Sequence, residues 1–205
     1  MVNDSKSIKT KGKRLNQLAQ QITRLDTSPL YVYRMENKYK PVFGEGNPDA
    51  DIMFIGEAPG AKEAETGRPF VGRAGQYLDS LLSSIDLKRE DVYITNIVKD
   101  RPPSNRNPHT AEIDIYAPFL CKQINIIQPK VIATLGRFAT AFIIDLFRLP
   151  QSGKKIGEIH GMIMHTTTDF GKVNIIPLYH PASVFYNRNL AAFIEKDFHT
   201  LKLLS

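Results

Sequence analysis

Four short runs of apolar residues recur along the chain. They span residues 51–56, 92–98, 130–136 and 174–179. Each run is apolar on both faces, which is typical of strands in a parallel sheet that helices cover. Segments with a helical period separate or follow these runs, at 75–85, 110–127, 138–147 and 189–204. This alternation predicts a three-layer α/β/α sandwich with a central four-stranded parallel sheet and right-handed crossovers.

The remaining segments complete this outline. Residues 1–12 are polar and basic, and we expect a flexible N-terminus there, followed by one domain over 13–205. Apolar residues between Leu15 and Leu25 recur at helical spacing and predict a leading helix. The segment 26–50 is rich in Pro, Gly, Asn and Asp, which indicates an irregular connection, and 157–168 is a candidate strand or hairpin at the sheet edge.

Composition adds limits rather than a function. The chain has 205 residues, 42% hydrophobic and 23% charged, and no apolar run is long enough to cross a bilayer. We therefore expect a soluble, cytoplasmic monomer with no membrane partner. A net charge of +6 favours contact with polyanions such as nucleic acid. Because Cys121 is the single cysteine, the chain forms no internal disulfide and no multi-cysteine metal site.

Polar residues follow three of the predicted strands. Glu57 comes directly after the first run, Asn96 lies near the end of the second, and His180 follows the fourth. In a parallel α/β fold, ligands bind at the carboxyl ends of the strands, so these side chains should face one crevice. The chain contains no GxGxxG, GxxxxGK[ST] or HExxH motif, which removes support for dinucleotide, P-loop and zinc-protease chemistry.

Six motifs at these strand ends occur together and in order. They are GEAPG (56–60), GRPFVGRAG (67–75), VYITNIVK (92–99), RPPSNRNP (101–108), LGRFA (135–139) and HPAS (180–183). Together they resemble the uracil-DNA glycosylase superfamily, and most of all its family 4. The resemblance implies a base-excision repair enzyme that flips uracil, or a related deaminated base, out of DNA and hydrolyses its N-glycosidic bond.

The resemblance also assigns roles to individual residues. It implies that Phe70 stacks on the extruded base, that Asn96 pairs with the edge of uracil, and that His180 donates a hydrogen bond to uracil O2. Glu57 and Asn105 match positions that matter for catalysis in this branch, and Gly56 and Ala58 belong to the substrate-binding loop. These residue types suit the task, because a neutral donor stabilises the negative charge that the departing base acquires.

Other residues in the same motifs are candidates for contact with the DNA strand. The hydroxyl and guanidinium groups that could hold phosphates belong to Arg73, Arg101, Ser104, Arg106 and Ser183. A side chain must also fill the space that the flipped base leaves. The candidates for this wedge directly follow HPAS and are Val184, Phe185 and Tyr186, and the first aromatic of the pair, Phe185, is included in the predicted DNA contacts.

The chain departs from the family pattern in two respects. Family 4 enzymes usually carry four cysteines around an iron–sulfur cluster, but Asp100 and Tyr116 stand where two are expected, 27–33 holds none, and Cys121 is out of register. We therefore expect no iron–sulfur cluster, no other cofactor and no metal. In addition, Ala58 stands where the better-known branch has a water-positioning aspartate, so the residue that handles water stays open.

Two alternatives to a glycosylase remain. One is a non-catalytic nucleic-acid-binding relative with the same fold, and the other is a hydrolase or transferase acting on a small nucleotide. Retention of the five polar and aromatic site residues together argues against the first, and the lack of phosphate-loop motifs argues against the second.

Overall fold

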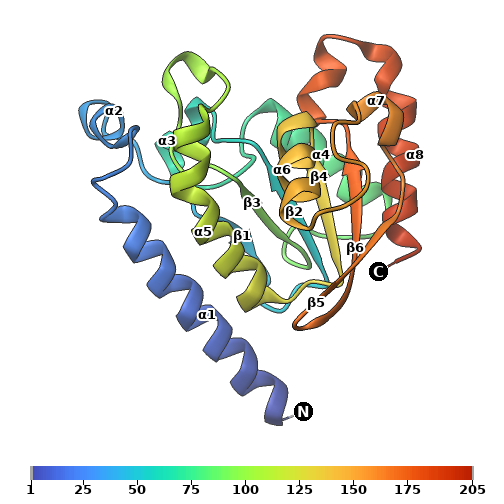
Figure 1. The fold of residues 1–205 in the computed structure, drawn as a ribbon, viewed down its shortest axis with the longest axis horizontal. Coiled ribbons are helices and arrows are strands. Elements are labelled where there is room, and N and C mark those ends of the chain that lie inside the picture. The colour runs from blue at the N-terminus through green and yellow to red at the C-terminus, as the bar shows by residue number, and fades with distance from the viewer. Residues whose placement is uncertain (1, 205) are drawn as a thin grey trace.

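A six-stranded sheet runs through the centre of the protein, with helices packed on both of its faces (Figure 1). The computed structural model describes residues 2–204, and their side chains from residue 8 onward. The strands are β1 (Glu45–Gly46), β2 (Ile52–Gly56), β3 (Tyr93–Asn96), β4 (Val131–Leu135), β5 (Met164–Thr168) and β6 (Gly171–Leu178). Their order across the sheet is β1-β3-β2-β4-β6-β5.

The predicted sheet of four parallel strands is confirmed as the centre of this larger one. β3, β2, β4 and β6 are parallel neighbours, whereas β1 and β5 pair antiparallel at the two edges. β5 is the edge strand expected within 157–168. β1 was not expected, because a two-residue strand gives no alternating pattern in the sequence.

Helices form the two outer layers. Their bounds are α1 (Val2–Thr23), α2 (Tyr31–Glu36), α3 (Ala61–Thr66), α4 (Arg73–Ser84), α5 (Thr110–Ile127), α6 (Arg137–Leu146), α7 (Ile156–Ile159) and α8 (Ala191–Lys202). Core residues of α1, α5 and α6 form one hydrophobic cluster, and those of α4 and α8 form the other. The three-layer sandwich is therefore as predicted.

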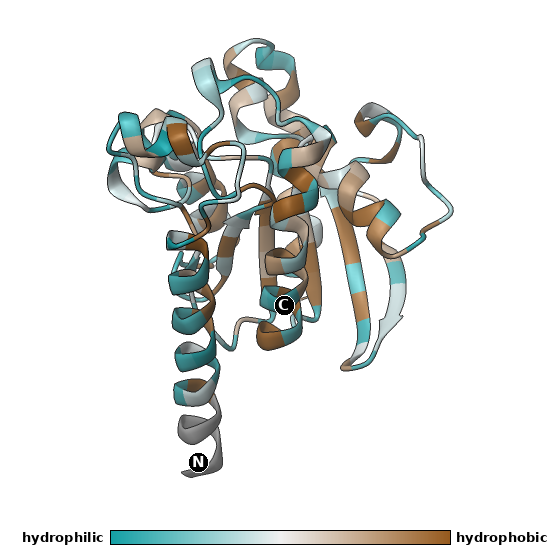
Figure 2. Cartoon of the chain, turned by 60° about the vertical axis from the view of Figure 1, so that its left-hand side comes forward, coloured by the Kyte–Doolittle hydropathy of each residue, from teal (hydrophilic) through white to brown (hydrophobic). Residues whose placement is uncertain are grey.

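The central strands are apolar because both of their faces are covered. In β2, Met53 and Ile55 belong to the cluster with α5, while Ile52 and Phe54 belong to the cluster with α8. All five residues of this strand are buried. Coloured by hydropathy, these strands appear largely brown, whereas α1 is mostly teal (Figure 2). Burial on both faces removes the alternation that a half-exposed strand would show.

The N-terminal segment is helical. α1 already begins at Val2, so the residues up to 12 are helical. Lys11 forms an ion pair with Asp49 and donates to the carbonyl of Ile127 at 2.9 Å. Further along α1, an apolar stripe that includes Leu18 and Ile22 packs into the core. No described helix is both long enough and apolar enough to span a membrane.

A buried polar network ties α2 and α5 to the segment after β3. We call it the Asp100 network, and it comprises Ser28, Arg34, Asp100 and Tyr116. The Arg34 guanidinium donates to both carboxylate oxygens of Asp100, at 3.0 and 3.2 Å, and the Tyr116 hydroxyl donates to Asp100 at 2.6 Å. The Tyr116 hydroxyl is also hydrogen-bonded to the Ser28 hydroxyl at 2.8 Å.

Burial makes this network expensive to break. The side chains of Arg34 and Asp100 are 3% and 0% exposed. Arg34 also donates to the carbonyl of Thr23 at 3.0 Å, at the end of α1. Water therefore cannot replace a lost partner, and the pair links three segments that are far apart in the sequence.

Replacing Asp100 should destabilise the fold strongly. Asp100→Leu leaves the Arg34 cation buried without its carboxylate, and we expect a loss of about 3–5 kcal/mol in the free energy of unfolding. Asp51→Leu is the matched control, because Asp51 pairs with Lys130 at the surface, where both side chains are more than half exposed; we expect a loss of less than about 1 kcal/mol. Urea unfolding measures both, and equal losses would contradict a stabilising network.

Candidate active site

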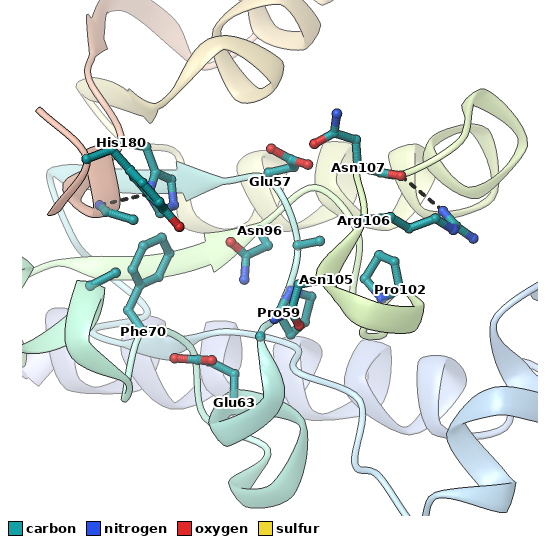
Figure 3. A pocket seen from close by; sticks show the side chains of 15 residues that line it. Glu57, Pro59, Glu63, Phe70, Asn96, Pro102, Asn105, Arg106, Asn107 and His180 are labelled. Carbon is teal, nitrogen blue, oxygen red and sulfur yellow. Dashed lines mark hydrogen bonds between the residues drawn. The ribbon is translucent and has the colours of Figure 1, made fainter. Parts of the chain in front are cut away.

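The carboxyl ends of β2, β3 and β6 open into one cavity of about 520 Å³. Figure 3 shows His180 and Phe70 on one side of it, Asn96 in the middle, and Pro102 and Arg106 on the other side. The residues that line the cavity are Glu57, Ala58, Pro59, Gly60, Glu63, Phe70, Ala74, Asn96, Pro102, Asn105, Arg106, Asn107, His180, Ala182 and Tyr186. The structure thus brings together the predicted catalytic residues Glu57, Asn105 and His180.

Asn96 places an unsatisfied amide at the base of the cavity. It is the last residue of β3 and is only 2% exposed. Its Oδ1 atom is buried and has no hydrogen-bond partner among the described residues. An unpaired buried acceptor is costly, so a ligand that brings a donor to this point of the cavity would be stabilised there.

Gly56 leaves the space that the side chains of Asn96 and Phe70 occupy. Gly56 is the register partner of Asn96 in the β2–β3 pair. A Cβ at Gly56 would lie 2.3 Å from Asn96 Oδ1 and 2.7 Å from Phe70 Cζ, far inside van der Waals contact. A side chain at Gly56 would therefore displace Asn96 and Phe70, both of which line the cavity. Ala58, the other predicted member of this loop, lines the cavity itself.

Phe70 and His180 form an adjoining wall. Their ring centroids are 5.7 Å apart, with the planes inclined by 30°. Phe70 is buried, at 6% exposure, and its backbone adopts a φ of 49°, in the left-handed region that residues with a Cβ seldom occupy. The flat face of the ring is therefore positioned by the backbone around it rather than by local preference.

His180 is held as a neutral hydrogen-bond donor. Its Nδ1 atom accepts from the backbone N–H of Ala182 at 3.1 Å, which leaves the ring proton on Nε2. Burial lowers the pKa of His180 to about 4, and the Glu63 carboxylate offsets this only in part. The Ser183 hydroxyl donates to the His180 carbonyl at 2.7 Å and fixes the backbone of this turn.

Glu57 and Asn105 complete the polar lining. Burial raises the pKa of Glu57, and the positive charge of Arg137 lowers it by a smaller amount. Asn105 is exposed at the rim, with a φ of 55°, and its side-chain oxygen accepts from Arg101 Nε at 2.8 Å. A carboxylate with a raised pKa is a better proton acceptor than an ordinary one.

Two of the arginines predicted to contact DNA are engaged within the protein. Arg106 lines the cavity and forms a two-pronged ion pair with Glu112 at 2.6 and 2.9 Å. Arg101 bonds to Asn105 and donates to the Tyr39 hydroxyl at 2.5 Å. These contacts hold the 101–107 loop in place, so both arginines position the loop whether or not they also touch phosphate.

The other predicted DNA contacts are near neighbours in sequence of residues that line the cavity, such as Ala74, Asn105 and Ala182. Arg73 is exposed at the start of α4, with its guanidinium 4.5 Å from the ring centre of Phe185. Ser104 is exposed on the 101–107 loop, and Ser183 is partly buried.

The three wedge candidates differ sharply in exposure. Val184 packs against the hydrophobic core, and Phe185 is 41% exposed beneath Arg73. Tyr186 is 91% exposed and lines the cavity. Of the three, Tyr186 is therefore the side chain most accessible to a bound DNA strand.

Two ionisable residues at or next to the cavity were not predicted from the sequence. Glu63 Oε1 accepts from the backbone N–H groups of Val71 and Gly72 at 2.9 and 2.8 Å. Lys99 is fully buried, which lowers its pKa, and its amino group donates to the Asn96 carbonyl at 2.6 Å. Glu63 lies on α3, between the GEAPG and GRPFVGRAG motifs, so the sequence did offer it as a candidate. Lys99 follows an apolar strand, and only the fold reveals its contacts.

The positions where the family resemblance implies cysteines do meet in space. Asp100, Tyr116 and Ser28 of segment 27–33 all belong to the Asp100 network. Iron–sulfur clusters are held by thiolates, but these groups are a carboxylate, a phenol and an alcohol that already bond to one another and to Arg34. Cys121 lines a separate hollow with Phe147 and Thr168. This donor set does not fit an iron–sulfur cluster.

Comparison with known proteins agrees with the motifs. Residues 43–202 match the model of the uracil DNA glycosylase superfamily. A type-4 uracil-DNA glycosylase of Archaeoglobus fulgidus is 44% identical over 167 residues, covering 82% of each chain. One from Thermotoga maritima is 39% identical over 182 residues, covering 88% of each chain. A type-5 enzyme of Thermus thermophilus is 34% identical over 128 residues, 55% of this chain and 58% of its own.

The chain therefore belongs to the uracil DNA glycosylase superfamily. Within it, the chain is similar over most of its length to the type-4 enzymes.

The state of His180 can be tested directly. We expect its imidazole to stay neutral, with the proton on Nε2, until the pH falls to about 4. Because unfolding returns the group to its ordinary pKa of 6.5, its contribution to stability is lost as the pH falls from 6.5 towards 4. Long-range ¹H–¹⁵N NMR, with His180→Gln to assign the signal, reports both proton and tautomer. Titration near 6.5 would contradict a buried, neutral donor.

Proposed function

We propose that this protein is a DNA glycosylase that removes uracil, or a closely related deaminated base, from DNA by hydrolysing the N-glycosidic bond. The observation that carries the proposal is the buried, unpaired Oδ1 of Asn96 in a cavity that Phe70 and His180 also line. The similarity to type-4 uracil-DNA glycosylases over most of the chain supports it.

Recognition of the base follows from the carboxamide of Asn96. Its oxygen accepts a hydrogen bond from N3–H of uracil, and its NH₂ group donates to O4. Cytosine presents the opposite groups at both positions, so it would leave the buried amide unpaired. Phe70 supplies the flat apolar face on which the base stacks.

Bond cleavage requires charge stabilisation at the base and a nucleophile at the sugar. When the N1–C1′ bond breaks, its electron pair stays with the base, and negative charge develops on N1 and O2. His180 Nε2–H donates to O2, and one such preorganised donor contributes about 3 kcal/mol to the transition state. Water adds to C1′ and gives its proton to a general base. Glu57 is our candidate for that base, with Asn105 orienting the water.

The mouth of the cavity is suited to an opened DNA strand. We propose that Tyr186, the most exposed of the wedge candidates, fills the space that the flipped base leaves, while Arg73 and Phe185 contact the strand beside it. The net charge of +6 draws the protein to the DNA backbone.

A uracil-bearing oligonucleotide tests this activity. We expect the wild-type protein to leave an abasic site that alkali cleaves, and His180→Ala and Asn96→Ala each to lower the single-turnover rate by about a hundredfold or more. Thermal melting checks that both variants fold. A wild-type protein that binds the oligonucleotide but leaves uracil in place would favour the non-catalytic alternative, and wild-type rates in both variants would contradict the assigned site.

We further propose that this activity needs no iron–sulfur cluster, because the Asp100 network supplies the contacts that join α2, α5 and the segment after β3. We expect protein purified without oxygen to be colourless and to contain less than about one iron atom per ten chains by metal analysis. We also expect it to excise uracil after treatment with an iron chelator. A visible absorbance band that tracks with activity would contradict this.

A further inference from the structure

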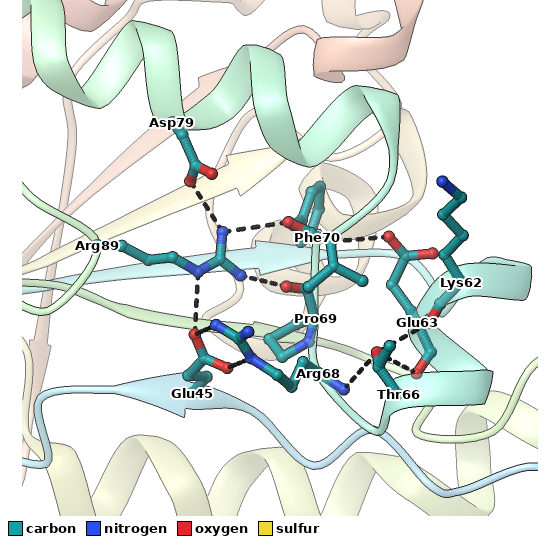
Figure 4. Close-up of polar contacts among 10 residues, drawn as sticks. Glu45, Lys62, Glu63, Thr66, Arg68, Pro69, Phe70, Asp79 and Arg89 are labelled. Atoms are coloured by element: carbon teal, nitrogen blue, oxygen red, sulfur yellow. Dashed lines mark hydrogen bonds and ion pairs between the residues drawn. The ribbon is translucent and has the colours of Figure 1, made fainter.

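The backbone of Phe70 is held from outside the cavity by Arg89. Arg89 lies in the turn between α4 and β3, nineteen positions beyond Phe70 in the chain. Its guanidinium donates to the Phe70 carbonyl at 3.1 Å and to the neighbouring carbonyl of Pro69 (Figure 4). A planar guanidinium can bridge two successive carbonyls in this way, whereas a lysine ammonium acts as a single point of charge.

Arg89 is itself fixed by two carboxylates. Its Nε donates to Glu45 at 3.0 Å, and one terminal nitrogen donates to Asp79 at 2.9 Å. The Arg89 side chain is only 18% exposed. Glu45 also pairs with Arg68 at 2.6 and 2.9 Å, but the Arg68 side chain is 60% exposed. Of these two arginines, Arg89 is the one that reaches the carbonyls around Phe70.

The backbone after Phe70 is held from the opposite side. Glu63 accepts from the N–H groups of Val71 and Gly72, the two residues that follow. α4 packs against the same turn so closely that a Cβ on Gly75 would lie 1.8 Å from the Phe70 carbonyl oxygen. These contacts define one backbone geometry for a residue that would not adopt a positive φ unaided.

We propose that Arg89 is a positioning residue for the reaction, which acts by holding the left-handed backbone of Phe70 so that its ring lies in the stacking position. The inference rests on the proposed function, since it assumes that Phe70 stacks on the extruded base. Arg89 is not among the residues that line the cavity, so its effect on the substrate passes through Phe70. A small displacement of a stacking ring is enough to slow a reaction that requires close alignment.

Arg89→Lys is the critical variant. Lysine keeps the positive charge between Glu45 and Asp79 but cannot bridge the two carbonyls. We expect it to melt near the wild-type temperature and to lower kcat/KM for uracil excision by roughly tenfold to a hundredfold. Arg68→Lys is the matched control, because it changes the other arginine on Glu45 without touching the Phe70 backbone, and it should stay within about twofold of wild type.

A double-mutant cycle with Phe70→Leu shows whether the effect passes through the ring. If Arg89 acts through Phe70, the pair Arg89→Lys/Phe70→Leu should be no slower than Phe70→Leu alone. Losses that multiply, or an Arg89→Lys variant as active as wild type while Phe70→Leu is impaired, would overturn the inference.

Binding separates this inference from the proposed function. An oligonucleotide with 2′-fluoro-2′-deoxyuridine resists cleavage, because fluorine disfavours a cation-like sugar. Fluorescence anisotropy then measures how much more tightly the protein binds this oligonucleotide than a matched one with thymine. We expect this preference to fall in Arg89→Lys and to persist in Arg68→Lys. A wild-type protein that shows the preference but never cleaves uracil would overturn the proposed function alone. An unchanged preference in Arg89→Lys would overturn the role of Arg89.

Discussion

The cavity depends on a missing side chain at the end of β2. Gly56 lies in register with Asn96, and any Cβ there would collide with the amide of Asn96 and the ring of Phe70. Parallel pairing of β2 and β3 brings the amide of Asn96 to the floor of the cavity. The absence of a side chain at Gly56 leaves room for the ring of Phe70 beside it.

Burial at this point also determines the charge of the cavity. It lowers the pKa of His180 and raises the pKa of Glu57, so both groups are shifted towards their neutral forms. Behind Asn96, burial likewise lowers the pKa of Lys99, whose amino group is hydrogen-bonded to three acceptors, from Thr95, Asn96 and Gln123. Hydrogen-bond donors in a neutral, buried cavity favour a ligand that acquires negative charge during the reaction over a ligand that is already an anion when it binds.

Much of this arrangement was visible in the sequence. The four parallel strands and the helices between them follow from apolar runs and helical periods, and the motifs at the strand ends located Glu57, Asn96 and His180 in one crevice. The short elements α2, α3, α7 and β1 were not predicted, because segments of two to six residues carry too little periodicity.

Contacts between distant segments were also beyond the sequence. Arg89 appears there as an ordinary charged residue in a turn, and nothing nearby indicates that it reaches Phe70. The local partner of Arg106 was also not predicted: Arg106 suggested phosphate binding, but it pairs with Glu112, six positions further along the chain. Individual roles of the site residues stay predictions, since they concern a substrate and not the fold alone.

The Asp100 network has a consequence for how the protein is made. Every group in it is encoded by the chain, and its donors and acceptors satisfy one another. The hydrogen bonds of the Asp100 network therefore form without iron, sulfide or proteins that deliver them. The network also contains no sulfur atom that peroxide could oxidise. On our proposal that no cluster is bound, assembly finishes when folding does, in a cell starved of iron as readily as in one with ample iron.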